Sequence, residues 1–188
     1  MIGRFSSVEI KDLAFSVLFI GIIFAYPNIN IYTILVALIG VGSGFIFHEL
    51  MHKFVAQHYG AISEYRAWYE GLIIGLILKI ILGTTFIAPG AVYIYKDYLT
   101  KKENGIIALS GPLTNVVLAF IFYIIALVSN NSLLYFIGNF GFMINLYLAG
   151  FNMLPIPPFD GYKVITWNPL IWAVVGVPLI AYVLLNIF

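Results

Sequence analysis

Long apolar runs, separated by short polar or proline-containing breaks, follow one another along nearly the whole chain. They lie at residues 13–26, 29–47, 71–95, 105–128, 133–154 and 170–188. An α-helix needs about 20 mostly apolar residues to cross the hydrocarbon core of a bilayer. The pattern therefore predicts an all-α polytopic membrane protein with five to six transmembrane helices. No linker is long enough to separate domains, so we expect residues 1–188 to form a single domain.

The first apolar run also fits a secretory signal peptide, because Arg4 and Lys11 precede it. No small-residue cleavage site follows this run, and the next apolar run begins almost at once. We therefore expect it to be retained as a transmembrane helix.

The run at residues 71–95 differs from the others because polar and helix-breaking residues interrupt it. Lys79 lies in its middle, where a lysine exposed to lipid is costly. Pro89-Gly90 breaks a helix late in the run. These features favour a re-entrant or hairpin segment that enters the membrane and returns to the same side. An ordinary spanning helix whose lysine faces the helix bundle is the alternative.

Composition agrees with a lipid bilayer as the surroundings of the chain. Hydrophobic residues make up 62% and charged residues 9%, against roughly 25% charged residues in soluble proteins. The net charge is only +1, which offers no basic surface to a phosphate backbone and excludes a nucleic-acid partner. The absence of cysteine excludes a disulfide framework and thiolate zinc ligands.

The distribution of positive charge predicts the orientation in the membrane. Connections 27–30 and 129–132 carry no charged residue, and positively charged loops tend to stay cytoplasmic. We therefore expect a multi-pass protein of the cell membrane with its N-terminus in the cytoplasm. The lysines at 96–102 lie on the cytoplasmic side only if the run at 71–95 enters the membrane and returns to the side from which it started.

His48, Glu49 and His52 form an H-E-x-x-H sequence at the polar end of the second predicted helix. Four residues advance a helix by about 400°, so both imidazoles lie on one face, one turn apart. This spacing suits one zinc ion, with the glutamate beside the water that the metal activates. Chance matches occur in many chains, but ionisable residues in a membrane segment are usually functional. We predict one Zn²⁺ per chain, with Glu49 as general acid and base.

A zinc site with two histidines needs a third protein ligand and an open position. His58 lies about 80° away from the face of His48, and we expect it at the aqueous end of the helix. The acids in the charged flanks lie beside basic residues, and we expect a solvated surface role for most of them. These acids are Glu9, Asp12, Glu64, Glu70, Asp97 and Glu103.

Asp160 is the remaining candidate for the third ligand. It follows a proline-rich segment at 155–158, whose prolines cannot continue a helix and therefore free backbone polar groups. Such backbone is tolerated at membrane depth only beside a cavity or buried protein. An ordinary exit loop is the alternative. If residues 71–95 return to their starting side, however, Asp160 can meet His48 and His52 at one membrane face.

Three segments together resemble the site-2 protease family of intramembrane zinc metalloproteases. They are HELMH at 48–52, GPLTN at 111–115, and Asn152-x-x-Pro155 followed by Asp160-Gly161. The combined pattern covers most of the chain and is far more specific than H-E-x-x-H alone. The resemblance is to a minimal form, because nothing here is long enough for the PDZ or CBS domains of larger members.

The resemblance implies a role for each residue of the motifs. His48, His52 and Asp160 match the zinc ligands, Glu49 the catalytic acid and base, and Asn152 a residue that steadies the substrate carbonyl or its oxyanion. It also implies a transmembrane protein as substrate, hydrolysed within or near its membrane-spanning helix.

Two further segments carry hypotheses of their own. Asn115, in GPLTN, either makes an ordinary interhelical hydrogen bond or lines the site. The run at 91–95 is rich in β-forming residues. We hypothesise that extended chain at 86–95 pairs with the unwound substrate by strand addition.

A non-cleaving membrane metal-binding protein or metal carrier is the alternative function. A carrier needs polar groups along a path across the membrane, whereas the candidate ligands cluster near one face. An inactive binder is expected to lack the acid and base, and Glu49 is present. The sequence carries no signal for an oligomeric state.

Overall fold

The computed structural model describes residues 3–85 and 89–187, most of which are helical. A single two-stranded sheet interrupts the helices of this described part. The elements in chain order are α1 (Ser7–Ala25), α2 (Ile31–Ala37), the π-helix η1 (Leu38–Gly42), α3 (Ser43–His58), β1 (Ile62–Ala67), α4 (Tyr69–Leu82), β2 (Gly90–Tyr95), α5 (Lys101–Val128), α6 (Ser132–Asn152), α7 (Asp160–Trp167) and α8 (Pro169–Ile187).

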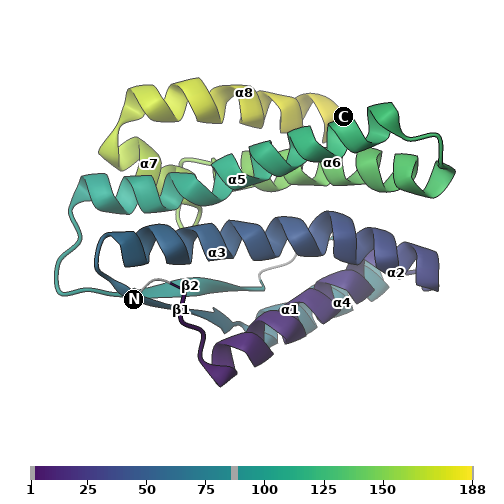
Figure 1. The fold of residues 1–188 in the computed structure, drawn as a ribbon, viewed down its shortest axis with the longest axis horizontal. Coiled ribbons are helices and arrows are strands. Elements are labelled where there is room, and N and C mark those ends of the chain that lie inside the picture. The colour runs from purple at the N-terminus through teal and green to yellow at the C-terminus, as the bar shows by residue number, and fades with distance from the viewer. Residues whose placement is uncertain (1–2, 86–88, 188) are drawn as a thin grey trace.

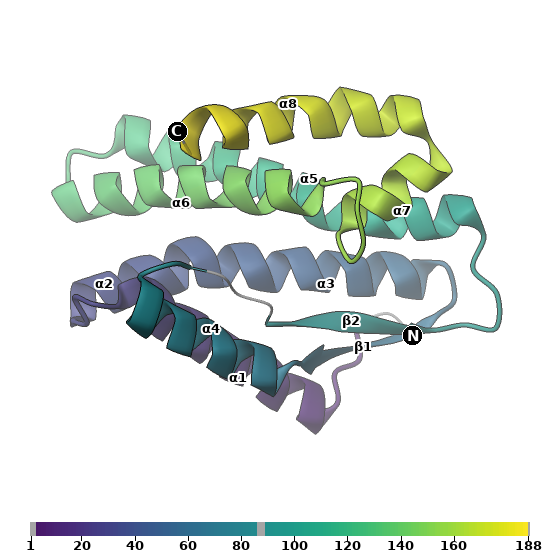
Figure 2. The same cartoon turned by 180° about the vertical axis from the view of Figure 1, so that it is seen from behind.

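The helix α3 lies between two groups of elements (Figures 1 and 2). The helices α5, α6, α7 and α8 form a layer on one side of it, and the sheet with α1 and α4 covers the other side. α2, η1 and α3 form one continuous helical stretch of 28 residues, Ile31–His58. Residues at the C-terminal end of this stretch are therefore enclosed from both sides.

The chain is a membrane protein, because four helices in its described part are long and apolar enough to cross a bilayer. They are Ile31–His58, Lys101–Val128, Ser132–Asn152 and Pro169–Asn186. The predicted count of five to six spans is not confirmed. α1 begins with three charged residues within its first six, and α4 has only 14 residues, about 21 Å of helix against a hydrocarbon core of about 30 Å.

The apolar run at 71–95 leaves the sheet and returns to it at the same point. β1 and β2 pair antiparallel, with Ala67 opposite Gly90, and the Trp68 N–H donates to the Pro89 carbonyl at 2.9 Å. A single helix over this run would end far from its start, so that alternative is wrong. The prediction of extended chain after Pro89-Gly90 is confirmed by β2, whereas residues 86–88 lie outside the described part.

Acidic side chains of α1 occupy the outer edge of β1. The Tyr65 N–H donates to Glu9 Oε1 at 2.9 Å, and the Ala67 N–H donates to Asp12 Oδ2 at 3.3 Å. Both acids are buried, so the expected solvated role is wrong for them. Their oxygens take the backbone donors that an added strand would need, which leaves β2 as the open edge of the sheet.

A buried ion pair joins α1 to α3 beside this edge. Lys53 Nζ lies 2.6 and 2.7 Å from the two carboxylate oxygens of Glu9, and both side chains are fully buried. Lys53 also donates to the Ser63 carbonyl at 3.0 Å. The pair therefore connects the helix that carries H-E-x-x-H to both α1 and β1.

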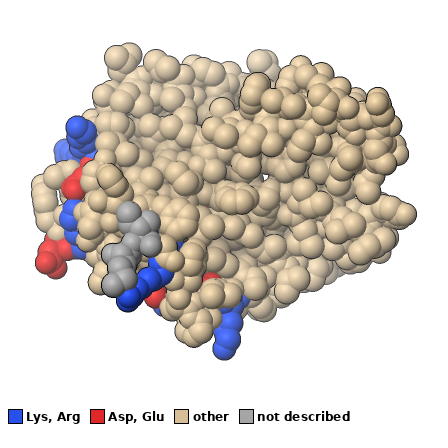
Figure 3. Space-filling view, in the orientation of Figure 1, with Lys and Arg blue, Asp and Glu red and all other residues tan. Residues whose placement is uncertain are grey.

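Charged side chains gather at one end of the molecule. Figure 3 shows them at the end where α1 and α5 begin, while most of the remaining visible face is uncharged. α3 and α6 run toward this end, and α5 runs away from it (Figure 1). A polar end on an otherwise apolar surface is the pattern expected of a chain that emerges from lipid there.

Candidate metal centre

Two separate parts of the chain supply the side chains of the site. His48 and His52 lie one turn apart on α3, and Asp160 is the first residue of α7. Figure 2 shows the loop between α6 and α7 reaching from its own layer toward α3. A Cβ on Gly161 would lie 2.1 Å from the Met153 carbonyl oxygen, so only glycine lets the loop fold back this closely.

The three ligand atoms form a compact triangle. His52 Nε2 lies 3.0 Å from His48 Nε2, and Asp160 Oδ2 lies 3.3 Å from His48 Nε2 and 3.0 Å from His52 Nε2. Ligands about 2.0–2.1 Å from a tetrahedral zinc ion are separated by about 3.3 Å. The predicted grouping of Asp160 with the histidines, and the return at 71–95 on which it depended, are therefore consistent with this geometry.

The hydrogen bonds behind the two rings fix where their protons lie. His48 Nδ1 lies 2.6 Å from Asn115 Oδ1, and His52 Nδ1 lies 2.7 Å from the Ile107 carbonyl oxygen. Both oxygens accept, so each Nδ1 carries the proton and each Nε2 presents a lone pair. In this tautomer, two lone pairs and a carboxylate converge on one point and can bind a cation between them.

A glycine keeps the space beside these atoms open. A Cβ on Gly111 of α5 would lie 2.5 Å from His52 Nε2 and 2.6 Å from His48 Nε2. Only a residue without a side chain fits here, so Gly111 lets α5 approach the ligand atoms closely. Two imidazoles and one carboxylate are the three protein ligands of a catalytic zinc site, so zinc fits the residues present.

Asp160 is ionised and held by contacts on both oxygens. Burial raises the pKa of its carboxyl group, but His52 and His48, when protonated in the metal-free site, lower it more, so the pKa lies below its usual range. Its second oxygen lies 3.5 Å from Lys163 Nζ, one turn further along α7. An ionised carboxylate is the form that binds a metal ion.

Glu49 lies beside the triangle and beside β2. The charged or titratable groups around its carboxylate are His48, Asp160 and Lys163, and the Val92 backbone is also a polar neighbour. The predicted acid and base is thus next to the ligand atoms and next to the open strand. Sequence reasoning missed Lys163, for which its spacing of three residues from Asp160 was the available signal.

Asn152 makes its hydrogen bond within its own helix. Its Nδ2 donates to the Leu148 carbonyl of α6 at 2.9 Å, at the end of the helix where the loop to Asp160 begins. Among the described residues no hydrogen bond joins it to the three ligands, and its role toward the substrate carbonyl stays a prediction.

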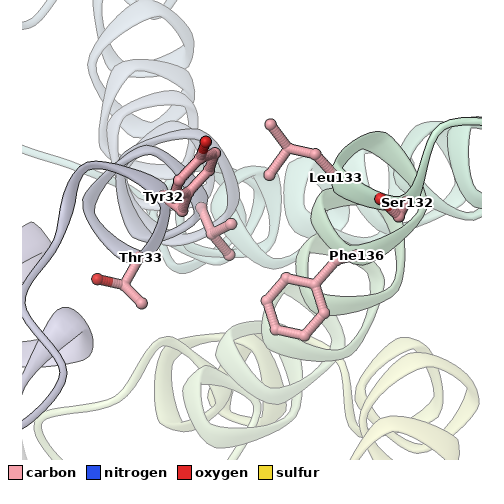
Figure 4. A pocket seen from close by; sticks show the side chains of 6 residues that line it. Tyr32, Thr33, Ser132, Leu133 and Phe136 are labelled. Atoms are coloured by element: carbon pink, nitrogen blue, oxygen red, sulfur yellow. The ribbon is translucent and has the colours of Figure 1, made fainter.

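Two other features lie outside the site. His58 is exposed at the end of α3, as expected from its angle to His48. A hollow between α2 and α6, lined by Tyr32, Thr33, Val36, Ser132, Leu133 and Phe136, lies at the N-terminal ends of both helices (Figure 4). The ligand residues come from the C-terminal half of α3 and from α7, so this hollow is not the metal centre.

Curated proteins similar to this chain carry zinc metalloprotease names. A Methanocaldococcus jannaschii protein named "Putative zinc metalloprotease MJ0611" is 68% identical over 188 residues, 100% of this chain and 98% of its own. "Putative zinc metalloprotease YwhC" of Bacillus subtilis is 26% identical over 64% of this chain and 63% of its own. "Putative zinc metalloprotease Rip2" of Mycolicibacterium smegmatis is 28% identical over 61% and 50%. No family model and no solved structure matches.

Proposed function

Because this chain belongs to the site-2 protease family of zinc metalloproteases, we propose that it hydrolyses peptide bonds within or near the transmembrane helices of other membrane proteins. The observation that carries the proposal is Glu49 beside two imidazole lone pairs and a carboxylate, at the end of a membrane-spanning helix. A protease site in this position meets peptide bonds at the depth of the bilayer.

His48, His52 and Asp160 would hold the zinc ion in this proposal. When bound, zinc supplies a Lewis acid that polarises the scissile carbonyl and lowers the pKa of the attacking water. Glu49 takes the proton of that water and later gives it to the leaving amide nitrogen. Its carboxylate needs no large movement for either transfer, because it already lies beside the ligand residues.

Asn152 and Lys163 are the groups that would meet developing charge. Asn152 would donate to the oxyanion after turning its amide away from Leu148, a contact worth about 2.7–4 kcal/mol of barrier in other proteases. Lys163 Nζ lies 3.5 Å from Asp160 Oδ1, so its positive charge would lie close to the reacting groups.

The open edge of β2 would bind the substrate as an added strand. A membrane helix must unwind before one of its carbonyls can reach the site, and unwound backbone in lipid needs hydrogen-bond partners. Main-chain groups of an edge strand supply such partners. The Val92 backbone lies next to Glu49, so a strand paired with β2 would pass the acid and base.

The same geometry supports an orientation in the membrane. The end of α3, the start of α5 and the end of α7 lie toward the charged end of the molecule, and α6 runs toward it (Figures 1 and 3). Placing this end in the cytoplasm, as the positive-inside rule requires, makes the mouth of the site cytoplasmic. α4 would then enter the same face of the cell membrane and return to β2.

The test uses zinc-loaded protein in liposomes with a tagged single-span membrane protein whose span carries a central Asn-Pro pair to ease unwinding. We expect native protein to release fragments cut in or near the span, identified by mass spectrometry. Glu49→Gln should keep about one zinc per chain and lose about 10²–10⁴-fold in rate. Asp160→Ala should lose zinc and cleavage, whereas Asp97→Ala, at an exposed position, should lose neither.

Native protein that binds zinc but releases no fragment from the span would contradict the proteolytic proposal and favour a non-cleaving metal-binding protein. Cleavage at the native rate by Glu49→Gln would contradict the role of Glu49. Zinc binding unaffected by Asp160→Ala would contradict the ligand set.

A further inference from the structure

We propose that Asn115 and Asn145 are positioning residues that hold the imidazole of His48 in the tautomer able to bind a metal. Both side chains are fully buried, on α5 and α6, and neither touches the metal position. They form a chain of hydrogen bonds that ends at His48 Nδ1. The inference rests on the proposed metal centre but not on the proteolytic step.

The chain of bonds begins at two backbone carbonyls. Asn145 Nδ2 donates to the Gly141 carbonyl at 2.8 Å and to the Gly40 carbonyl, in η1, at 3.3 Å. Carbonyl oxygens only accept hydrogen bonds, so the amide of Asn145 cannot turn over without losing both bonds. Its Oδ1 is therefore directed to Asn115.

Two hydrogen bonds from its amide nitrogen orient Asn115 in the same way. Its Nδ2 donates to Asn145 Oδ1 at 2.9 Å and to the Gly44 carbonyl of α3 at 3.1 Å. Both partners accept, so Oδ1 of Asn115 is the atom that faces His48 Nδ1 at 2.6 Å. A reversed amide would present a donor to Nδ1, and the ring proton would then lie on Nε2.

A proton on Nε2 would occupy the lone pair that faces His52 and Asp160. The Asn115–Asn145 pair therefore decides whether His48 is a ligand, although it is remote from the cation itself. The bonds also connect η1 and the start of α3 to α5 and α6. The position of the His48 imidazole is therefore fixed relative to three helices, the continuous α2–η1–α3 stretch, α5 and α6. Every polar atom of the two amides has a partner, as a buried network needs to be specific.

The test compares zinc affinity, by chelator competition, in variants of nearly equal size. Asn115→Leu fills a similar volume without an acceptor, whereas Asn115→Asp keeps an acceptor toward His48. We expect Asn115→Leu to weaken zinc binding by about 10–100-fold, as loss of an outer-shell partner does elsewhere. Asn115→Asp should weaken it less, because it keeps the acceptor toward His48 although it loses the donor toward Asn145 and Gly44. Thr114→Val is the matched control, because Thr114 bonds only to the Ser110 carbonyl of its own helix among described residues.

Ring ¹⁵N chemical shifts of the zinc-free protein give a readout that a general loss of stability would not mimic. The chain has three histidines, so His48 can be assigned by substitution. We expect the Nδ1–H tautomer in native protein and in Thr114→Val, and a mixture with Nε2–H in Asn115→Leu. Asn145→Leu should shift the tautomer the same way and weaken zinc binding less than Asn115→Leu does.

Native zinc affinity and an unchanged tautomer in Asn115→Leu would overturn the inference while leaving the protease proposal intact. Equal losses in Asn115→Leu and Asn115→Asp would overturn it too, because the acceptor would then not matter. If Asn115→Leu prevents folding, the tautomer and the zinc affinity of Asn145→Leu test the inference instead, because this variant leaves the contact between Asn115 and His48 in place. Native protein that binds no zinc would instead contradict the metal centre itself.

Discussion

His48 and His52 present the same atom to the metal position but are fixed by different kinds of partner. His52 Nδ1 is held by the backbone carbonyl of Ile107, which belongs to α5 and cannot be removed by substitution. His48 Nδ1 is held by a side chain, Asn115. The orientation of His52 thus depends on the backbone of α5, whereas the orientation of His48 depends on which side chain stands at position 115.

Gly111→Ala should remove zinc binding while leaving the fold in place. The added methyl group would lie 2.5–2.6 Å from both Nε2 atoms, well inside van der Waals contact, so the rings or α5 must move apart. Alanine is a better helix former than glycine, so helicity measured by circular dichroism should not fall. Bound zinc should drop clearly below one per chain.

The control for this substitution is Leu113→Ala, two residues further along α5 at an exposed position. Its zinc content should equal that of native protein. Full zinc occupancy in Gly111→Ala would mean that the space beside the histidines is not the coordination position.

At the scale of elements, α1 is required for the site although it contributes no ligand. Glu9 and Asp12 hold β1, and Lys53, one residue after His52, is tied to Glu9. A burial cost of several kcal/mol for each charge is offset only while both partners are present. The ion pair therefore links the folding of α1 to that of α3.

Lys53→Met should destabilise the protein by about 3–5 kcal/mol, because it leaves Glu9 charged and unpaired in a buried position. The free energy of unfolding in detergent, measured by denaturant titration, checks this value. The double variant Glu9→Leu/Lys53→Met should recover most of the loss. A single variant as stable as native protein would show that the pair is not buried in the folded protein.

Ile94→Pro should slow cleavage of a membrane substrate without unfolding the sheet. The Trp68 N–H bonds to the Pro89 carbonyl, so Trp68 and Pro89 form a hydrogen-bonded pair of the β1–β2 ladder. Hydrogen-bonded and non-hydrogen-bonded pairs alternate along antiparallel strands. Ile94, five residues after Pro89, therefore belongs to a non-hydrogen-bonded pair, and its N–H points away from β1. Proline there removes a donor from the open edge only. Tyr93→Pro removes a donor that pairs with β1 and should lower stability as well.

Rates with a membrane substrate and melting temperatures of the two variants separate these effects. Cleavage by Ile94→Pro at the native rate would refute strand addition at β2.

For the whole molecule, the uneven distribution of charge predicts which ends of the helices share a side of the membrane. The chain has no cysteine, so single cysteines can report on sidedness. Lys102→Cys, at the start of α5, should be labelled by a membrane-impermeant thiol reagent from the cytoplasmic side. Asn130→Cys, between α5 and α6, should be labelled from the opposite side. Labelling of both positions from one side would contradict the proposed crossing by α5.

The features that could be predicted without knowledge of the fold are local ones. Four-residue spacing on a helix places His48 and His52 on one face whatever the rest of the fold does. Apolar runs mark the four helices long enough to span a bilayer, but they also mark 13–26 and 71–95, for which a span is not confirmed. The proline break at 89 likewise predicted extended chain, because proline cannot continue a helix. Charge bias and the need for a third ligand together predicted a return at 71–95 and Asp160 as the third ligand, and both stay predictions with which the geometry is consistent.

Only the tertiary structure decided the contacts between segments far apart in the chain. Glu9 and Asp12 have polar neighbours in sequence and therefore resembled solvated flanks, but packing of α1 on β1 buries them against backbone donors. Asn145, in the middle of an apolar run, is detectable as a polar residue in a membrane helix, yet its link to His48 runs through Asn115 on another helix. Burial and hydrogen-bond direction depend on which helices meet, and local periodicity does not encode that.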